Sequence, residues 1–278
     1  MSGRSAFLLL VLAAAGLTAG CVPVDEVESG MPPPSQAPIR ADGQPFADLD
    51  AGAAQLDSLH FTIRAYGQDN AKQIGEGAEQ SYQRVMLDTN LFSFQPRGLY
   101  KIVVYGSQQE YMQKTLQPSW SGGCSVTNAI YTFTSPQMQQ TIAHEMTHLI
   151  WYEYMGRSEM DQRWVNEGLA VYEELKAAGP GRDPFTLQRA TLRTTPLTID
   201  QLIHLVPATE RERTVALWYA QSEDLVRFMI ERGGRMGFSQ FLAGLRDGRT
   251  WDDAVNSAYV GQWRTLNDVY VGWQNTLQ

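Results

Sequence analysis

The sequence predicts an α+β domain, with a small mixed sheet in its N-terminal part and helices in its C-terminal half. From Leu56 onward, strand-like and helix-like spacings of apolar residues alternate over about 80 residues, and the spacing after that is almost wholly helical. A hydrophobic fraction of 43%, with seven tryptophans, supplies enough apolar surface for a substantial core. We therefore assign the folded domain to residues 56–278.

Alternating or β-branched runs predict three strands, at 59–66, 99–106 and 125–133. Helical spacing predicts two helices between them, at 71–89 and 108–116. A further helix that contains residues 144–148 should end near Gly156. Five more helices are expected after it, at 161–177, 215–231, 236–246, 251–258 and 262–276. Thr250 and Asp253 have the spacing of a capping box at one of these helix starts.

The first twenty residues predict an export signal and not a part of the fold. Arg4 precedes the apolar run "AFLLLVLAAAG", and small residues follow at 18–20. The stretch "LTAGC" then resembles the lipobox of bacterial lipoproteins, in which the cysteine is acylated and becomes the mature N-terminus. This resemblance implies a lipoprotein signal peptide over 1–20 and a membrane anchor on Cys21. A plain secreted protein cut near Ala19 is the alternative.

An exported lipoprotein would face the periplasm or the cell exterior. Val22, rather than Asp, follows the lipid-bearing cysteine, which favours the outer membrane by analogy with lipoprotein sorting. Residues 21–55 are expected to form a tether, because six prolines lie between positions 22 and 45 among glycine, serine and acidic residues. Cys124 is then the only other cysteine, and we expect it to be a small buried residue without a disulfide.

The charge of the chain argues against one class of partner. The formal net charge is −8 and no run of lysine and arginine occurs. A surface that follows a phosphate backbone needs such positive charge, so nucleic acid is not an expected partner.

Two of the chain's four histidines stand four residues apart in "HEMTH", residues 144–148. On an α-helix this spacing puts His144 and His148 on one face, so both imidazoles can bind a single metal ion. Glu145 lies one step round the helix, where it can reach a water on that ion as a general base. Stray histidines on a buried helix are the other interpretation, because the apolar residues of 149–151 follow.

A third ligand would decide between these interpretations, since a catalytic zinc is held by three protein groups. A histidine six residues after His148 is excluded, because Tyr154 stands there. Glu167 has a suitable position. The first helix should end near Gly156, and after a short turn Glu167 should lie about as far into the returning helix as His148 lies from the end of the first. Two antiparallel helices would then bring Glu167 level with His148. A surface acid on a helix rich in acids is the alternative.

"HEMTH" and the glutamate of "WVNEGLA", after eighteen intervening residues, resemble the HExxH-x18-E signature of gluzincin metallopeptidases. From about residue 58 to the C-terminus the chain is most similar to the peptidase MA-like domain, a relative of thermolysin-like and aminopeptidase-type zinc enzymes. The resemblance implies a zincin catalytic domain with one Zn²⁺ ion on His144, His148 and Glu167, and with Glu145 as the base. It also implies a substrate-lining edge strand in "VTNAIYTF" and a tyrosine-bearing helix in "LWYAQSEDLVRFMIERGG".

The implied reaction is hydrolysis of a peptide bond in a peptide or protein substrate of the cell envelope. Glu145 would take a proton from a zinc-bound water and pass it to the leaving amine. Tyr219 is our candidate for a second donor to the oxyanion, and a core tyrosine beside Trp218 is the alternative. No stretch that would hold a free amino terminus is visible, which favours an endopeptidase.

Two other classes of function stay open from the sequence. The first is an exported zinc-binding lipoprotein that acts as a non-catalytic assembly or adaptor module. The intact Glu145 counts against it, because a site that only binds metal does not need that base. The second is a structural lipoprotein that binds no metal, and the expected height of Glu167 on its helix counts against it.

Overall fold

The computed structural model describes residues 44–156, 160–181 and 183–278. The expected signal peptide, Cys21 and the tether as far as residue 43 lie outside the described residues. None of the helices within these ranges has the length and apolar character that a membrane span requires.

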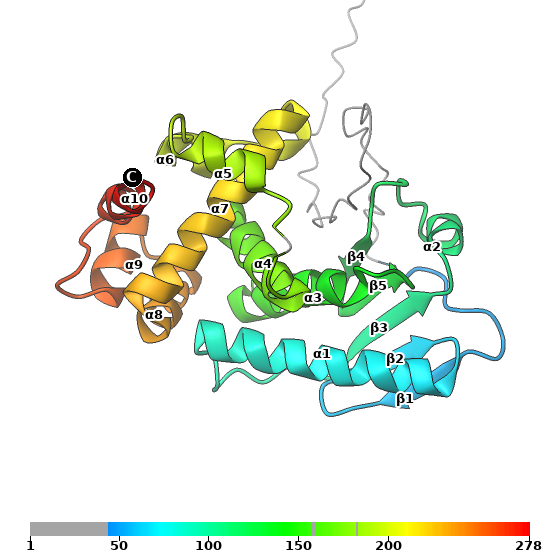
Figure 1. Cartoon of the computed structure of the whole chain (residues 1–278). Helices are drawn as coiled ribbons and strands as arrows, with labels where there is room; N and C mark the ends of the chain where they lie inside the picture. The colour runs from blue at the N-terminus through cyan, green and yellow to red at the C-terminus, as the bar shows by residue number, and fades with distance from the viewer. Residues whose placement is uncertain (1–43, 157–159, 182) are drawn as a thin grey trace, which may run out of the picture.

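A mixed sheet of five strands forms the N-terminal part of the described chain (Figure 1). In sheet order the strands are β1 (Ala54–Asp57), β2 (Phe61–Ala65), β3 (Tyr100–Tyr105), β5 (Ala129–Phe133) and β4 (Gly123–Val126). The three central strands β2, β3 and β5 run parallel, and β1 and β4 pair antiparallel at the two edges. The predicted α+β class, with a small mixed sheet before a helical half, is therefore confirmed.

The segment predicted as one strand over 125–133 is instead a hairpin. β4 ends at Val126 and β5 begins at Ala129, so only Thr127 and Asn128 form the turn. Thr127 takes a positive φ of 56°, as tight two-residue hairpin turns require. The edge strand expected in "VTNAIYTF" is thus β4, whereas most of that stretch lies in β5, inside the sheet.

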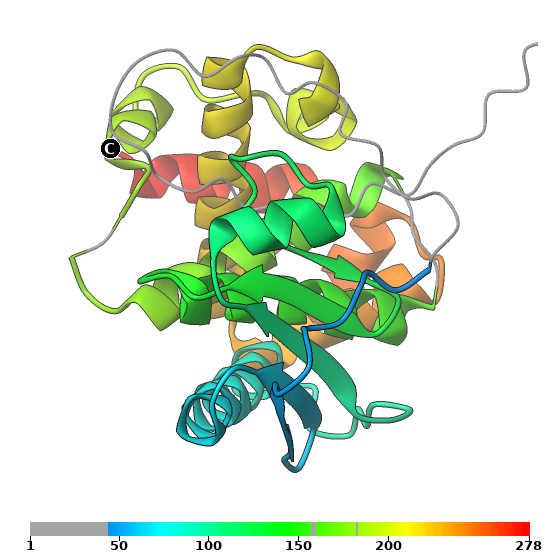
Figure 2. The same cartoon turned by 90° about the vertical axis from the view of Figure 1, so that its right-hand side faces the viewer.

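Each face of the sheet is covered by its own layer. Ile102 and Val104 of β3 pack with α1 (Gln68–Thr89) and α3 (Met138–Met155), while Val103 and Tyr105 point to the opposite face, towards α2 (Gln108–Thr115). Figure 2 shows α1 and α2 on opposite sides of the sheet. This alternation explains why the β-branched run of β3 is buried on both faces.

The folded part begins before the expected boundary at residue 56. Phe46 and Leu49 are buried on the α2 face, where the Phe46 ring meets Tyr131 edge-to-face at 5.1 Å between ring centroids. The last residues assigned to the tether therefore belong to the fold. Cys124 is buried in the same cluster, which confirms the predicted burial of this small residue.

In the described residues, the regular structure of the C-terminal half is entirely helical. It comprises the 3₁₀ turn η1 (Met160–Gln162), α4 (Arg163–Ala178), α5 (Thr186–Leu192), α6 (Ile199–His204), the 3₁₀ turn η2 (Pro207–Thr209), α7 (Glu212–Gly233), α8 (Arg235–Arg246), α9 (Trp251–Ala258) and α10 (Leu266–Thr276). The helices α5 and α6 were not predicted, because they are too short to display an apolar period. The Thr250 hydroxyl oxygen accepts a hydrogen bond from the Asp253 backbone, so the predicted N-cap of α9 is confirmed. The Asp253 carboxylate accepts from the Thr250 hydroxyl at 2.8 Å instead of from the Thr250 backbone, so the full capping box does not form.

The helix α3 ends where the sequence predicts it. Gly156 ends α3 with a positive φ of 67°, and its N–H donates to the Tyr152 carbonyl at 3.0 Å. The chain then returns through η1, and α4 packs against α3. The two neighbouring antiparallel helices that the sequence predicts are thus present. The histidines of the predicted metal site lie on α3 and its glutamate lies on α4.

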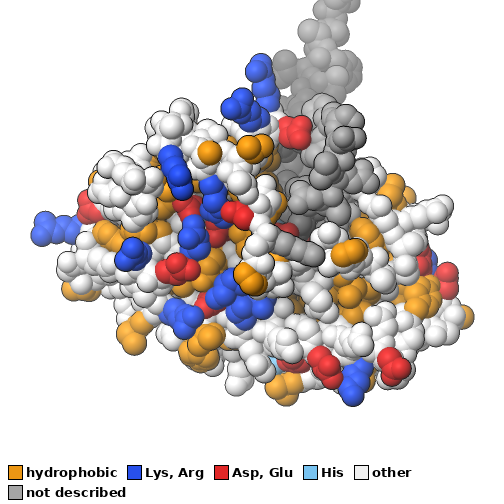
Figure 3. Space-filling view, viewed as in Figure 1, with side chains coloured by type: hydrophobic (Ala, Val, Ile, Leu, Met, Phe, Trp, Pro, Cys, Tyr) orange, Lys and Arg blue, Asp and Glu red, His pale blue; other side chains and the backbone are white. Residues whose placement is uncertain are grey.

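Ion pairs join α4 to α1 as well. Asp88 of α1 is fully buried and takes Lys176 of α4 and Arg235 of α8 as partners, the latter at 2.8 Å. Arg84 of α1 pairs with the buried Glu173 of α4 at 2.9 Å. Figure 3 shows lysine and arginine side chains gathered over the helical half of the molecule on this face. Such pairs hold α4 in place from a second direction.

A glycine sets how closely α4 approaches α7. A Cβ atom on Gly168 would lie 2.4 Å from the carbonyl oxygen of Ser222 in α7 and 2.9 Å from a methyl of Val226. The obstacle is backbone, which cannot rotate aside as a side chain can. Gly168 therefore fixes the height of α4, and with it the position of Glu167 one residue before.

We expect Gly168→Ala to destabilise the protein by about 1–3 kcal/mol, because the new methyl forces α4 away from α7. Urea unfolding measures this change. Gly77→Ala in α1 is the matched control, since the three atoms nearest to its Cβ belong to the movable carboxamide of Gln139. The gain in helix propensity should make that control neutral or stabilising by up to about 1 kcal/mol. Equal stability of the two variants would contradict the role given to Gly168.

Candidate metal centre

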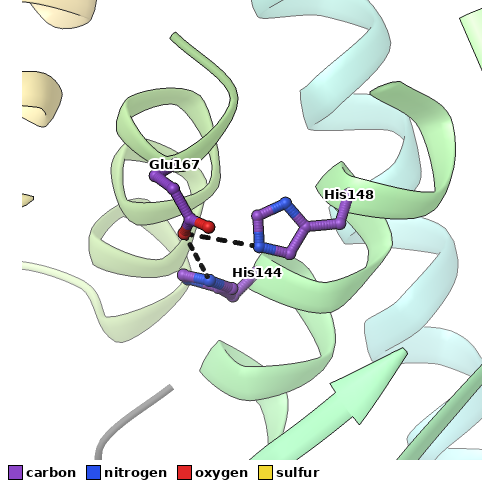
Figure 4. Close-up of side chains that lie close together, drawn as sticks. All are labelled: His144, His148 and Glu167. Carbon is purple, nitrogen blue, oxygen red and sulfur yellow. Dashed lines mark ion pairs between the residues drawn. The ribbon is translucent and has the colours of Figure 1, made fainter. Parts of the chain in front are cut away.

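Three buried side chains from two helices converge on one point (Figure 4). His144 and His148 project from successive turns of α3, with ring centroids 4.8 Å apart. Glu167 reaches across from α4, and its Oε2 lies 3.8 Å from His144 Nε2 and 3.6 Å from His148 Nε2. One potential ligand atom from each residue lies within 4.8 Å of the other two. The predicted set of three ligands is therefore brought together.

These three atoms fit a divalent metal ion. Zinc bonds to nitrogen and oxygen at about 2.0–2.2 Å, so tetrahedral ligand atoms stand about 3.3–3.6 Å apart. The separations of 3.6 and 3.8 Å from Glu167 Oε2 are close to this value and too long for hydrogen bonds. His144 Nε2, His148 Nε2 and Glu167 Oε2 are all buried, and none has a hydrogen-bond partner within the described ranges. A shared cation would satisfy all three atoms at once.

A hydrogen bond to Nδ1 of each ring holds the ring in the metal-binding orientation. His144 Nδ1 lies 2.9 Å from Glu174 Oε2, and His148 Nδ1 lies 3.0 Å from the Asn166 side-chain oxygen. Because a carboxylate and an amide oxygen are acceptors, each Nδ1 carries the proton and donates it. The lone pair of each ring is then on Nε2, which faces Glu167.

Burial keeps both imidazoles neutral. It lowers the pKa of His144 to about 4, against the opposing effect of Glu167. Burial also lowers the pKa of His148, where Glu167 again acts in the opposite direction. Neutral imidazole is the form that binds metal, so little free energy is needed to deprotonate these ligands at neutral pH.

Glu145 stands beside this cluster without taking part in it. Its carboxyl group is fully buried, and neither oxygen makes a hydrogen bond of normal geometry in the described part of the chain. Burial raises the pKa of the Glu145 carboxyl well above its usual range; nearby Ser125 of β4 opposes this rise, and Glu167 adds to it. A carboxyl group with a raised pKa next to a metal site suits proton transfer near neutral pH.

The structure brings together four of the five residues that the sequence singled out. Tyr219 lies on α7, half-buried, with its ring edge-to-face against Trp218 at 5.1 Å between centroids. Its role as an oxyanion donor stays a prediction.

Asn166 and Glu174 were missed as parts of the site. The available signal was their place on α4: Asn166 precedes Glu167, and Glu174 follows it by seven residues, about two helical turns. Side chains two turns apart share a helix face, so Glu174 was a candidate for contact with the histidines. The sequence alone suggests instead a surface acid next to Glu173.

A mixed sheet followed by two antiparallel helices that present two histidines and a glutamate defines a gluzincin-like domain. The family model that describes the Peptidase MA superfamily matches residues 77–278, from the middle of α1 to the C-terminus. The chain belongs to this superfamily. The matched region contains all the residues of the metal centre. No curated protein matches the chain significantly.

We expect the protein to bind one Zn²⁺ ion per chain and to be stabilised by it. At free zinc 100-fold above the dissociation constant, the free energy of unfolding should rise by about 2.7 kcal/mol. Glu167→Gln keeps the side-chain size and removes the charged ligand, so zinc affinity should fall more than about 100-fold, a larger loss than changes behind a ligand give. Calorimetric titration measures the number of bound ions and the affinity, and urea unfolding with and without zinc measures the change in stability. Glu231→Gln, an exposed position on α7, is the control and should bind zinc like the wild type.

Proposed function

We propose that this protein is a zinc-dependent peptidase of the cell envelope that hydrolyses peptide bonds with Glu145 as its general base. One observation carries the proposal: three ligand atoms without hydrogen-bond partners in the described ranges converge beside the buried carboxyl group of Glu145, whose pKa is raised well above its usual range by burial. A site that only binds metal accounts for the first feature and leaves the second without a purpose. Membership of the Peptidase MA superfamily supports the same reaction class.

The chain's own residues would divide the work as follows. His144, His148 and Glu167 would hold the ion. Bound zinc supplies Lewis-acid chemistry that polarises the scissile carbonyl and lowers the pKa of a water molecule. Glu145 accepts the proton of the attacking water on a carboxylate oxygen and later delivers it to the leaving nitrogen.

The edge strand next to the base supports a peptide substrate. β4 is the last strand of the sheet in the part that the structure describes, and Ser125 of β4 is a neighbour of the Glu145 carboxyl. An extended peptide can add to such an edge by main-chain hydrogen bonds, which give affinity with little side-chain selectivity. This mode of binding favours cleavage within chains, as expected of an endopeptidase.

We also propose that lipid on Cys21 anchors the peptidase to a membrane, with the outer membrane favoured. The export signal and "LTAGC" support this location. The mass of the mature N-terminal peptide tests it, because acylated Cys21 and a cut at Ala19 give different products.

Glu145→Gln should keep zinc and lose turnover. The amide has the size of the carboxyl group and cannot accept the proton, so we expect cleavage of a quenched-peptide library to fall by about 10²–10⁴-fold. Zinc content should stay at one ion per chain. The control is Glu76→Gln, an exposed acid of α1. Equal cleavage by wild type and Glu145→Gln would contradict the assigned base, and zinc binding without any cleavage by the wild type would favour the adaptor function.

Tyr219→Phe tests the proposed oxyanion donor. The change removes only the hydroxyl, so turnover should fall by about 10²-fold or more if that hydroxyl stabilises the transition state. Zinc content and stability should stay the same. Unchanged turnover in the same peptide assay would leave Tyr219 with a packing role beside Trp218.

A further inference from the structure

The two histidines of the metal centre have unequal partners. His144 Nδ1 meets a carboxylate, Glu174 Oε2 at 2.9 Å, whereas His148 Nδ1 meets a neutral amide, Asn166 Oδ1 at 3.0 Å. We infer that Glu174 is a positioning residue that fixes the tautomer of His144 and raises the metal affinity of the site through that ring. The inference deepens the proposed function, because it rests on the same zinc site.

The position of Glu174 on α4 makes this contact a rigid one. Glu167 and Glu174 are seven residues apart in one uninterrupted helix, so both side chains leave α4 on the side that faces α3. The Glu174 side chain is only 23% exposed and the His144 ring 3%. Water therefore competes poorly for this hydrogen bond, and a single helix sets the distance from the ligand carboxylate to the group behind the ligand imidazole.

Charge explains why a carboxylate serves better than an amide at this position. A divalent ion on two neutral imidazoles and the Glu167 carboxylate leaves a net charge of +1 among these groups. All three ligands are buried, and a net charge in such surroundings is unfavourable. Glu174 supplies the balancing negative charge one imidazole ring away from the ion. It also makes His144 a more basic ligand, because the Nδ1 proton is drawn towards the carboxylate.

Two substitutions separate the hydrogen bond from the charge. Glu174→Gln keeps an oxygen that can accept from Nδ1–H and loses the charge, while Glu174→Ala loses both. Glu173→Gln is the matched control: it is the neighbouring buried acid of α4, but it pairs with Arg84 and not with a ligand histidine. A purely structural effect of losing a carboxylate from α4 should appear in the control as well.

The first measurement needs no metal. Imidazole ¹⁵N spectra of the metal-free protein at pH 7.5 report which ring nitrogen carries the proton, and the chain has only four histidines to assign. We expect the Nδ1–H form for both ligand histidines in the wild type. Glu174→Ala should change the tautomer of His144 and leave His148, with its Asn166 partner, unchanged. An unaltered Nδ1–H signal of His144 in Glu174→Ala would overturn the positioning role.

The second measurement is the zinc dissociation constant, obtained by competition with a chelator. We expect it to rise about tenfold in Glu174→Gln and about 100-fold in Glu174→Ala, and to stay within twofold of the wild type in Glu173→Gln. A dissociation constant of Glu174→Gln within twofold of the wild type would overturn the role of the charge.

The outcomes for this inference and for the proposed function differ. Weaker zinc binding in both variants, together with no cleavage of peptides by the wild type, would keep the inference and reject the peptidase. A wild type that binds no zinc would reject both. Peptide cleavage by a wild type whose zinc affinity does not depend on residue 174 would reject the inference alone.

Discussion

The packing of α4 between α3 and α7 is the constraint on which the metal centre depends. His144 and His148 are fixed relative to each other by one turn of helix, but Glu167 reaches them only if α4 lies at the right height. Gly168 sets that height, since any side chain there would meet the backbone of Ser222. The ligand set is thus a product of helix packing. The same packing brings Asn166 and Glu174 behind the two rings, so α4 supplies one ligand and both of the groups that orient the others.

The buried ligand atoms of the metal-free site also make an unfavourable contribution to the free energy of folding. A buried polar atom without a partner costs about 1–3 kcal/mol, and three such atoms meet at the centre of this cluster. The side chains cannot relieve this by moving apart, because both helices are held in the core and Glu174 and Asn166 hold the rings from behind. A bound cation turns the unfavourable term into a favourable one. Metal binding and the stability of the helix pair are therefore coupled, as is usual where ligands are buried before the ion arrives.

Much of this arrangement could be predicted from the sequence, for reasons that are local. The spacing of "HEMTH" and the end of α3 at Gly156 depend on helix geometry alone, and Glu167 follows from the length of the turn. The hairpin of β4 and β5 was missed because Thr127 and Asn128 do not carry a glycine to mark the turn. The helices α5 and α6 were missed because they are held by tertiary contacts, such as the hydrogen bond from Trp218 Nε1 to the Leu202 carbonyl at 2.8 Å. Glu174 was missed because its role depends on the facing helix, which a pattern along one helix does not contain.

The arrangement of charges explains how one small site can hold several carboxyl groups with different tasks. Glu167 has its oxygen directed at the two imidazoles, and Glu174 is hydrogen-bonded to Nδ1 of His144. Glu145 is fully buried beside them, with Ser125 of β4 as its neighbour. A bound cation would interact directly with Glu167, and the His144 Nδ1–H donates a hydrogen bond to Glu174. Burial raises the pKa of Glu145 and favours its protonated form, and nearby Ser125 opposes this only in part. The carboxyl group whose pKa burial raises is the one that can gain and lose a proton near neutral pH, and this difference in surroundings separates the proposed base from the ligands beside it.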